Sequence, residues 1–223
     1  MTQVRELKPY HLEIDVPAGR DEVWDTVTQP PILHQWFGWD YDGLVTEIKQ
    51  IFVDEATLWA PEQMGWADGS FLEVTGDDDT ARVRVVRESD APGGPEVYDP
   101  IEEGWRSFLI QLRFLLERRP EGPRRTLYLT GETTARQALT LASGEWEQFG
   151  PRVAWTVDNE QLIVVAGRIP LDSPAAARFE VTVSMFGADD ATFETAREIW
   201  AKRWIPLAAD ANLTTATDRA PGT

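Results

Sequence analysis

The stretch RDEVWDTVTQPPILHQWFGWDYD (20–42) decides the predicted fold. Its first part, DEVWDTVT, predicts a short amphipathic helix that ends before Pro30, because the residue before a proline avoids helical backbone. Pro31 suits the first turn of a second short helix, which carries Trp36 and Phe37 on one side. We therefore expect two short helices and an aromatic corner that pack against a sheet.

The residues on either side of this stretch predict strands. The run HLEIDV (11–16) alternates apolar and polar side chains, which is typical of a half-buried strand. We expect further strand regions at residues 44–61 and 70–88. The acidic segment GDDDT (76–80) has the composition of a hairpin turn within the second of these regions.

The clearest predicted helix is EEGWRSFLIQLRFLLERR, residues 102–119. Trp105, Phe108 and Leu112 recur in it at helical spacing. The segment PEGP (120–123) ends the helix and marks the expected boundary between two units. We expect the first unit to contain residues 1–119.

Residues 125–208 repeat this order of elements in shorter form. A strand comes first, then a helix in TTARQALTLASGEWEQFG (133–150), which begins with a capping-box pattern at Thr134 and Gln137. A hairpin, another strand and a Trp-bearing helix at 191–207 follow. We expect a second α+β unit here, although a single domain with a C-terminal extension fits the pattern as well. The expected flexible tail contains residues 209–223.

Composition limits the classes of partner and of chemistry. The chain of 223 residues has a formal net charge of −17, which disfavours nucleic acids and anionic membranes as partners. It contains no cysteine, so disulfides, thiolate nucleophiles and Cys-ligated metals are excluded. No segment is apolar and long enough to span a membrane, and no secretory signal is recognisable, so we expect a cytoplasmic protein.

No catalytic set can be assembled from the sequence. His11 and His34 are the only imidazoles, and two distant histidines without cysteine are a poor zinc site. The acidic run 77–79 lacks the spacing of a calcium loop, and no phosphate-binding loop or serine nucleophile motif is present. We therefore expect no metal, no cofactor and no catalytic residue. His34 remains open as a ligand-orienting residue or a surface residue.

Four segments together resemble the START-like, helix-grip (SRPBCC) superfamily: HLEIDVPAG, DEVWDTVTQP, LHQWFG and EEGWRSFLIQLRFLLE. The resemblance covers residues 10–119 and is greatest to the branch called activator of heat shock protein 90 ATPase homologue-like, which has bacterial members. The glycine-rich strand that is usual after the second helix is not found. The resemblance implies an α+β fold in which a curved antiparallel sheet packs on a long C-terminal helix. The order of elements in residues 125–208 adds the expectation of a second, abbreviated copy of similar topology.

Such a fold commonly encloses an apolar cavity between sheet and helix. We expect non-enzymatic binding of a small hydrophobic or aromatic molecule there. One alternative is a co-chaperone-like protein-interaction module. Another is a cyclase or hydrolase-type enzyme for a polyketide-like substrate, which would need His34 with acidic or basic neighbours in the cavity. The residues expected to bind the ligand are His34, Trp36, Phe37, Trp59, Met64, Trp66, Phe71, Trp105, Phe108 and Leu112.

Overall fold

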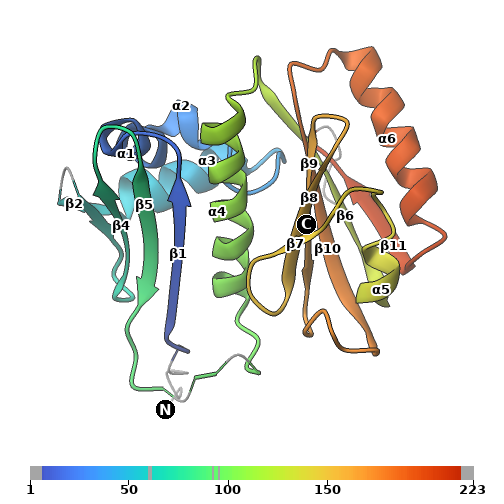
Figure 1. Ribbon diagram of the computed structural model, residues 1–223, viewed down its shortest axis with the longest axis horizontal. Helices are drawn as coiled ribbons and strands as arrows, with labels where there is room; N and C mark the ends of the chain where they lie inside the picture. The colour runs from blue at the N-terminus through green and yellow to red at the C-terminus, as the bar shows by residue number, and fades with distance from the viewer. Residues whose placement is uncertain (1–6, 60–61, 92, 95, 217–223) are drawn as a thin grey trace.

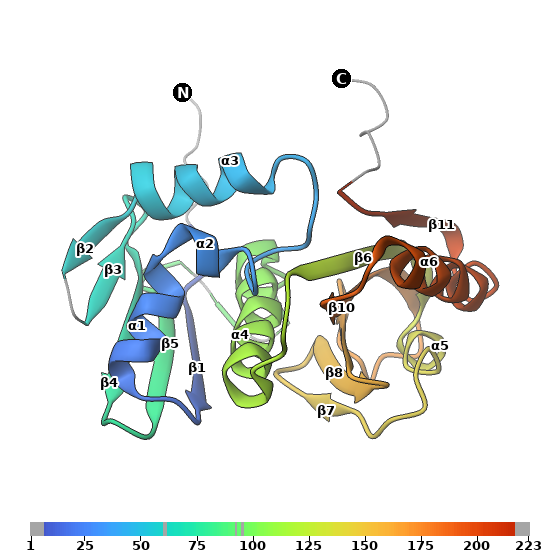
Figure 2. The ribbon, with the colours of Figure 1, turned by 90° about the horizontal axis from the view of Figure 1, so that it is seen from above.

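Two antiparallel sheets flank one long helix. The structure is a computed structural model that describes residues 7–59, 62–91, 93–94 and 96–216. The long helix, α4 (Pro100–Arg118), lies between the two sheets (Figure 1). Seen from above, α6 (Asp190–Trp204) lies on the far side of the second sheet (Figure 2). The predicted α+β class, with antiparallel sheets and a long helix, is confirmed.

The first sheet has the strand order β1-β5-β4-β3-β2, and all neighbouring strands are antiparallel. The predicted alternation is present in β1, where Leu12, Ile14 and Val16 are buried and the residues between them are exposed. The predicted hairpin is also present, and the Asp77 carboxylate accepts hydrogen bonds from two backbone N–H groups of its turn. The strands are β1 (Tyr10–Val16), β2 (Thr57–Trp59), β3 (Gln63–Gly65), β4 (Ser70–Gly76) and β5 (Ala81–Arg87).

The two short helices predicted from the opening stretch are present. They are α1 (Arg20–Thr28), which packs on β4 and β5, and α2 (Pro30–Leu33). The indole Nε1 of Trp36 donates a hydrogen bond to the carbonyl oxygen of Thr26 at 3.0 Å. This bond joins the aromatic corner after α2 to the end of α1.

The strand predicted across residues 44–61 is largely wrong. This segment forms α3 (Leu44–Lys49), then a π-helical turn, η1 (Gln50–Asp54), and only afterwards the short strand β2. Leu44, Ile48 and Phe52 are buried and lie four residues apart. That spacing places them on one face of a helix, and their burial outweighs the β-propensity of the segment.

The predicted long helix is confirmed and forms α4. The Asp99 side chain caps it by accepting hydrogen bonds from the N–H groups of Ile101 and Glu102. Its apolar side chains point in two directions. Trp105, Leu109, Leu112 and Leu116 belong to the core of the first sheet, whereas Ile110 and Phe114 pack on the second sheet. Neither α4 nor any other helix in the described ranges is long and apolar enough to span a lipid bilayer.

The second sheet has the strand order β11-β6-β10-β9-β8-β7. Both of its faces are covered, by α6 on one side and by α4 on the other. This explains why β9 reads as a nearly continuous apolar run, QLIVVAG, rather than as an alternating one. The strands are β6 (Arg124–Thr134), β7 (Glu147–Gln148), β8 (Val153–Asp158), β9 (Gln161–Gly167), β10 (Ala176–Phe186) and β11 (Ala209–Thr214).

Two expectations for the second half need correction. The helix predicted for residues 133–150 is only α5 (Ala135–Ala138), although its Thr134–Gln137 capping box is present. Leu141 and Ala142 are buried beyond the helix end, so core packing sets the path of the chain there. The tail expected at 209–223 begins instead with β11, which pairs with the edge of β6 that is opposite to β10. Residues 217–223 of that tail lie outside the described part of the chain.

Candidate functional site

A cavity of about 610 Å³ lies between the first sheet and the N-terminal half of α4. Its walls come from the aromatic corner, from α3 and η1, from the β3–β4 turn and from α4. The lining residues are Phe37, Glu47, Ile51, Glu55, Trp66, Ala67, Asp68, Ser70, Pro100, Ile101, Gly104, Trp105 and Phe108.

Aromatic rings form the deep wall of the cavity. The ring centroids of Phe37 and Phe108 are 4.6 Å apart, and those of Trp66 and Trp105 are 5.8 Å apart. Behind them, Phe52 packs edge-on against Phe37 at 4.8 Å. Tilted and edge-on contacts of this kind fix the ring orientations. The wall therefore offers a preformed apolar surface.

The polar lining consists of three carboxylates and a hydroxyl. Glu47 accepts a hydrogen bond from Tyr41 Oη at 2.7 Å, and burial together with this bond raises the pKa of Tyr41. The Asp68 carboxylate accepts hydrogen bonds from the N–H and the hydroxyl of Ser70. No Lys or Arg belongs to this lining, and Glu47, Glu55 and Asp68 form no ion pair within the described residues. A negative rim of this kind repels anions.

The structure brings together four of the ten residues expected to bind the ligand: Phe37, Trp66, Trp105 and Phe108. The other expected aromatics on strands lie elsewhere. Phe71 points to the outer face of β4, opposite to its buried neighbour Leu72, and lies under the Arg84 guanidinium at 6.0 Å. Trp59 lies on the edge strand β2 and is 56% exposed.

Three further expected residues are part of the core rather than of the cavity wall. Trp36, Met64 and Leu112 are fully buried among the strands and helices of the first sheet. His34 lies at the C-terminal end of α2, is half-buried and does not line the cavity. Its expected role in orienting a ligand therefore lacks the required geometry, and the enzymatic alternative retains only the carboxylates of the cavity.

Several lining residues were missed in the sequence. Glu47, Ile51 and Glu55 belong to α3, η1 and the residue after them, where a strand had been expected. The recurrence of apolar residues at 44, 48 and 52 is the signal that could have revealed a helix there. Within the described residues, no group of three or more His, Cys, Asp or Glu side chains could hold a metal ion.

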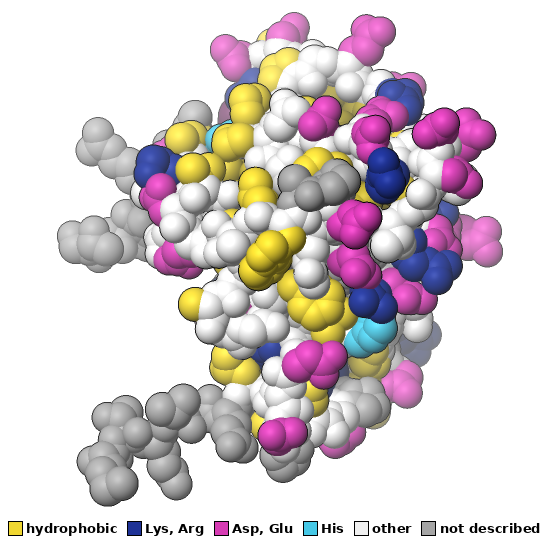
Figure 3. All heavy atoms as spheres, turned by 90° about the vertical axis from the view of Figure 1, so that its left-hand side faces the viewer, with side chains coloured by type: hydrophobic (Ala, Val, Ile, Leu, Met, Phe, Trp, Pro, Cys, Tyr) yellow, Lys and Arg dark blue, Asp and Glu magenta, His cyan; other side chains and the backbone are white. Residues whose placement is uncertain are grey.

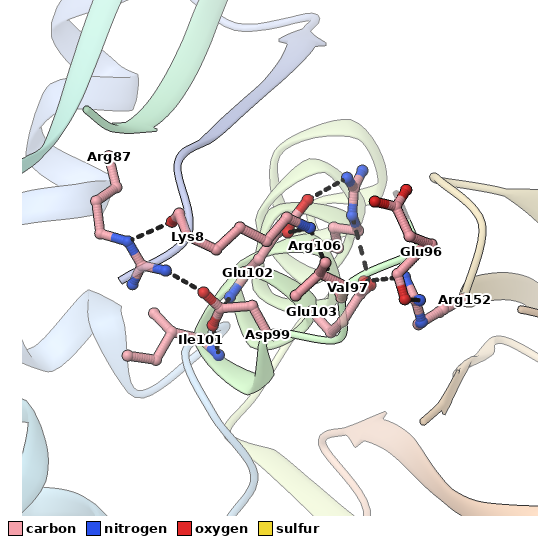
Figure 4. A network of polar contacts seen from close by, with 10 residues as sticks. All are labelled: Lys8, Arg87, Glu96, Val97, Asp99, Ile101, Glu102, Glu103, Arg106 and Arg152. Carbon is pink, nitrogen blue, oxygen red and sulfur yellow. Dashed lines mark hydrogen bonds and ion pairs between the residues drawn. The ribbon is translucent and has the colours of Figure 1, made fainter. Parts of the chain in front are cut away.

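A network of charged side chains positions the first turns of α4 (Figure 4). Buried Arg87 of β5 forms an ion pair with Asp99, the residue that caps the helix. Lys8 Nζ lies 2.6 Å from a carboxylate oxygen of Glu102, and Arg106 Nη2 lies 2.7 Å from the other. These contacts hold α4 to the first sheet, and thereby fix the orientation of the aromatic residues that follow.

The same network extends to the second sheet through Glu103. One oxygen of this carboxylate, Oε1, lies 3.4 Å from Arg152 Nη1, just before β8. The other, Oε2, has no hydrogen-bond partner, although Arg106 Nε is 3.4 Å away. Burial is the main cause that raises the pKa of Glu103, since a charged carboxylate loses hydration there.

This pKa shift predicts a pH-dependent contribution to stability. The folded state binds the Glu103 proton more tightly than the unfolded state, so this contribution is present below the ordinary glutamate pKa. It is lost as the pH rises through the folded-state pKa. We therefore expect the unchanged protein to lose stability relative to Glu103→Gln as the pH rises from the ordinary glutamate pKa through the folded-state pKa. Urea titrations at several pH values measure this difference in unfolding free energy. Parallel curves would contradict the assignment, and the exposed Glu132→Gln controls for charge removal.

Comparisons with known proteins leave the family of this chain open. No protein-family model matches the chain, and no curated protein matches it. Two solved structures are similar at low TM-score. DynU16, a protein of the dynemicin biosynthetic locus, is 15% identical over 89% of this chain and 95% of its own, with a TM-score of 0.32. BexL, a di-domain ARO/CYC of the BE-7585A biosynthetic pathway, is 13% identical over 96% of this chain and 100% of its own, with a TM-score of 0.35. Neither likeness decides the function of this chain.

Proposed function

We propose that this protein binds a small hydrophobic or aromatic molecule, without chemical conversion, in the cavity between the first sheet and α4. The observation that carries the proposal is the aromatic wall of Phe37, Trp66, Trp105 and Phe108 around about 610 Å³ of space. Pockets for small molecules commonly have volumes of about 300–1,000 Å³ and mainly apolar linings. The acidic rim favours a neutral ligand, or one with a cationic end, over a fatty acid.

A cavity-filling variant tests this proposal. Ile51 is half-buried and lines the cavity, so Ile51→Trp should fill it and weaken binding of the neutral fluorophore 1-aminoanthracene by about tenfold or more. Val53 lies on the same π-helical turn but is exposed, so Val53→Trp is the matched control and should bind as the unchanged protein does. Fluorescence titration measures both affinities.

Thermal unfolding gives a second measurement of the same binding. A ligand that binds only the folded state should stabilise it by about 2.7 kcal/mol at a hundredfold excess over Kd. Equal affinity in both tryptophan variants, or no stabilisation by neutral aromatic compounds, would contradict the proposal.

Two alternative functions, a protein-interaction module and an enzyme, would then be favoured. Leu58 and Trp59, exposed on β2, support a protein-interaction module (Figure 3 shows this side, where hydrophobic and acidic side chains lie together). The carboxylates of the cavity support an enzyme.

We also infer that the second unit, residues 125–208, is a degenerate copy of the first. In the first sheet, β1 pairs with β5, the last strand of a meander, and α4 follows. In the second, β6 pairs with β10, again the last strand of a meander, and α6 follows. The order of strands and helices, rather than sequence similarity, supports this inference.

A further inference from the structure

A second cavity, of about 290 Å³, lies on the opposite side of α4. It is enclosed by this helix, by the corner at Gly38 and Trp39, and by β6, β9 and β10 of the second sheet. Figure 2 shows how α4 stands between the two sheets, so that one helix contributes walls to both cavities. The wall that the two cavities share contains Pro100, Gly104 and Phe108.

One end of the second cavity is aromatic. The rings of Trp39 and Tyr128 are stacked, with centroids 4.5 Å apart and planes 6° from parallel. Tyr98 also lines the cavity, and the Arg168 guanidinium lies 5.9 Å from its ring. These rings, together with Phe108, offer flat apolar surfaces to a ring-shaped ligand.

The polar groups of this cavity include both acceptors and donors, because two carboxylates, several hydroxyl groups and the Arg168 guanidinium line it. Burial raises the pKa of Tyr128, and the neighbouring Glu180 carboxylate raises it further, which keeps the hydroxyl protonated. Thr182 and Ser107 contribute hydroxyl groups.

Glu103 adds a buried carboxylate, one oxygen of which accepts no hydrogen bond. Its side chain is 4% exposed, lines the cavity, and has an oxygen, Oε2, without a hydrogen-bond partner. In Figure 4 this side chain lies near Arg106 and Arg152, in the first turn of α4. It is on the side of the helix that faces the second sheet. A buried polar atom left without a partner costs free energy, so a donor supplied by a ligand would be favoured there.

We propose that this cavity is a second binding site, which takes a small neutral aromatic molecule that carries a hydroxyl group. The ring packs against Trp39, Tyr128 and Phe108, and the hydroxyl donates a hydrogen bond to the carboxylate of Glu180 or Glu103. Two carboxylates against the single Arg168 guanidinium give the lining a net negative charge, which disfavours a carboxylate-bearing ligand. The site is separate from the cavity of the proposed function, and it stands if that proposal fails.

Calorimetric titration of the full chain with 1-naphthol, naphthalene and 1-naphthoate tests the ligand class. We expect 1-naphthol to bind at least about tenfold more tightly than either comparator, because only the hydroxyl is both neutral and a donor. Glu180→Gln or Glu103→Gln, whichever removes the accepting carboxylate, should weaken 1-naphthol binding by about tenfold, and neither should change naphthalene binding. Equal affinity for all three probes, tighter binding of 1-naphthoate, or no binding of 1-naphthol would overturn the proposal.

Cavity-filling variants locate the site. Ala166 lies on β9 and lines the second cavity but not the first, so Ala166→Phe should reduce the affinity for 1-naphthol by about tenfold, to that of naphthalene. Thr182→Leu fills the same cavity from β10 and serves if Ala166→Phe does not fold. Val53→Trp, on the exposed side of η1, is the matched control and should leave 1-naphthol binding intact. Loss of the tighter 1-naphthol binding in Ile51→Trp but not in Ala166→Phe would place 1-naphthol in the first cavity, which would overturn this proposal while supporting the proposed function.

Discussion

Replacement of Arg124 by Ala is expected to lower the free energy of unfolding by about 3–5 kcal/mol. Arg124 is the first residue of β6, and its buried guanidinium lies where α4, the corner at Phe37 and Gly38, and the second sheet meet. It donates hydrogen bonds to the carbonyl oxygens of Phe37 at 3.1 Å and Gly38 at 2.9 Å. It also donates to the side-chain oxygens of Gln111 and Ser184. The substitution leaves several buried acceptors without a donor, and each such loss costs about 1–3 kcal/mol.

Urea unfolding followed by tryptophan fluorescence measures this loss. Arg118→Ala is the control, because Arg118 is exposed at the end of α4 and should change the free energy by less than about 0.5 kcal/mol. Arg124→Lys keeps the charge but not the planar fork of donors, and should recover little of the stability. If Arg124→Ala costs no more than Arg118→Ala, the guanidinium does not stabilise the junction of α4, the aromatic corner and the second sheet.

Trp36→Ala is expected to lower the free energy of unfolding by about 3–5 kcal/mol as well. The indole is fully buried, packs edge-on against Phe37 at 6.0 Å, and donates a hydrogen bond to Thr26. Its removal leaves a large cavity and an unpaired carbonyl oxygen at the end of α1. The substitution should also make the position of Phe37 less fixed, because Phe37 packs against this ring and lines the first cavity.

A second tryptophan provides the matched control for this experiment. Trp59 had been predicted to share a site with Trp36, but it lies exposed on β2. Trp59→Ala should therefore change the free energy of unfolding by less than about 0.5 kcal/mol in the same urea titration. Comparable losses in the two variants would contradict the placement of these side chains.

Local patterns in the sequence were enough to predict much of the fold. The alternation in β1, the acidic turn of the β4–β5 hairpin and the helical spacing in α4 all concern residues close together along the chain. Such signals depend on the periodicity of one element and need no knowledge of its neighbours. The corner containing Trp36 and Phe37 was predictable for the same reason.

The composition of the site was harder to predict, because it depends on which face of each element points inward. The alternation in β4 contained part of the answer: with Leu72 and Val74 in the core, Phe71 must point outward. No local pattern separates exposed Trp59 from Trp66, which lines the cavity. The role of Arg124 was equally hidden, because its carbonyl partners lie 86 and 87 residues away in sequence.

Because α4 packs against both sheets, few of its positions should accept a different amino acid. One of its sides packs in the core of the first sheet through Leu109 and Leu112, and another packs on the second sheet through Ile110 and Phe114. By contrast, α6 leaves Glu198 and Lys202 exposed on its outer side. Random substitutions should therefore be tolerated at far fewer positions in α4 than in α6. Engineers who wish to attach a label or alter surface charge should choose α6.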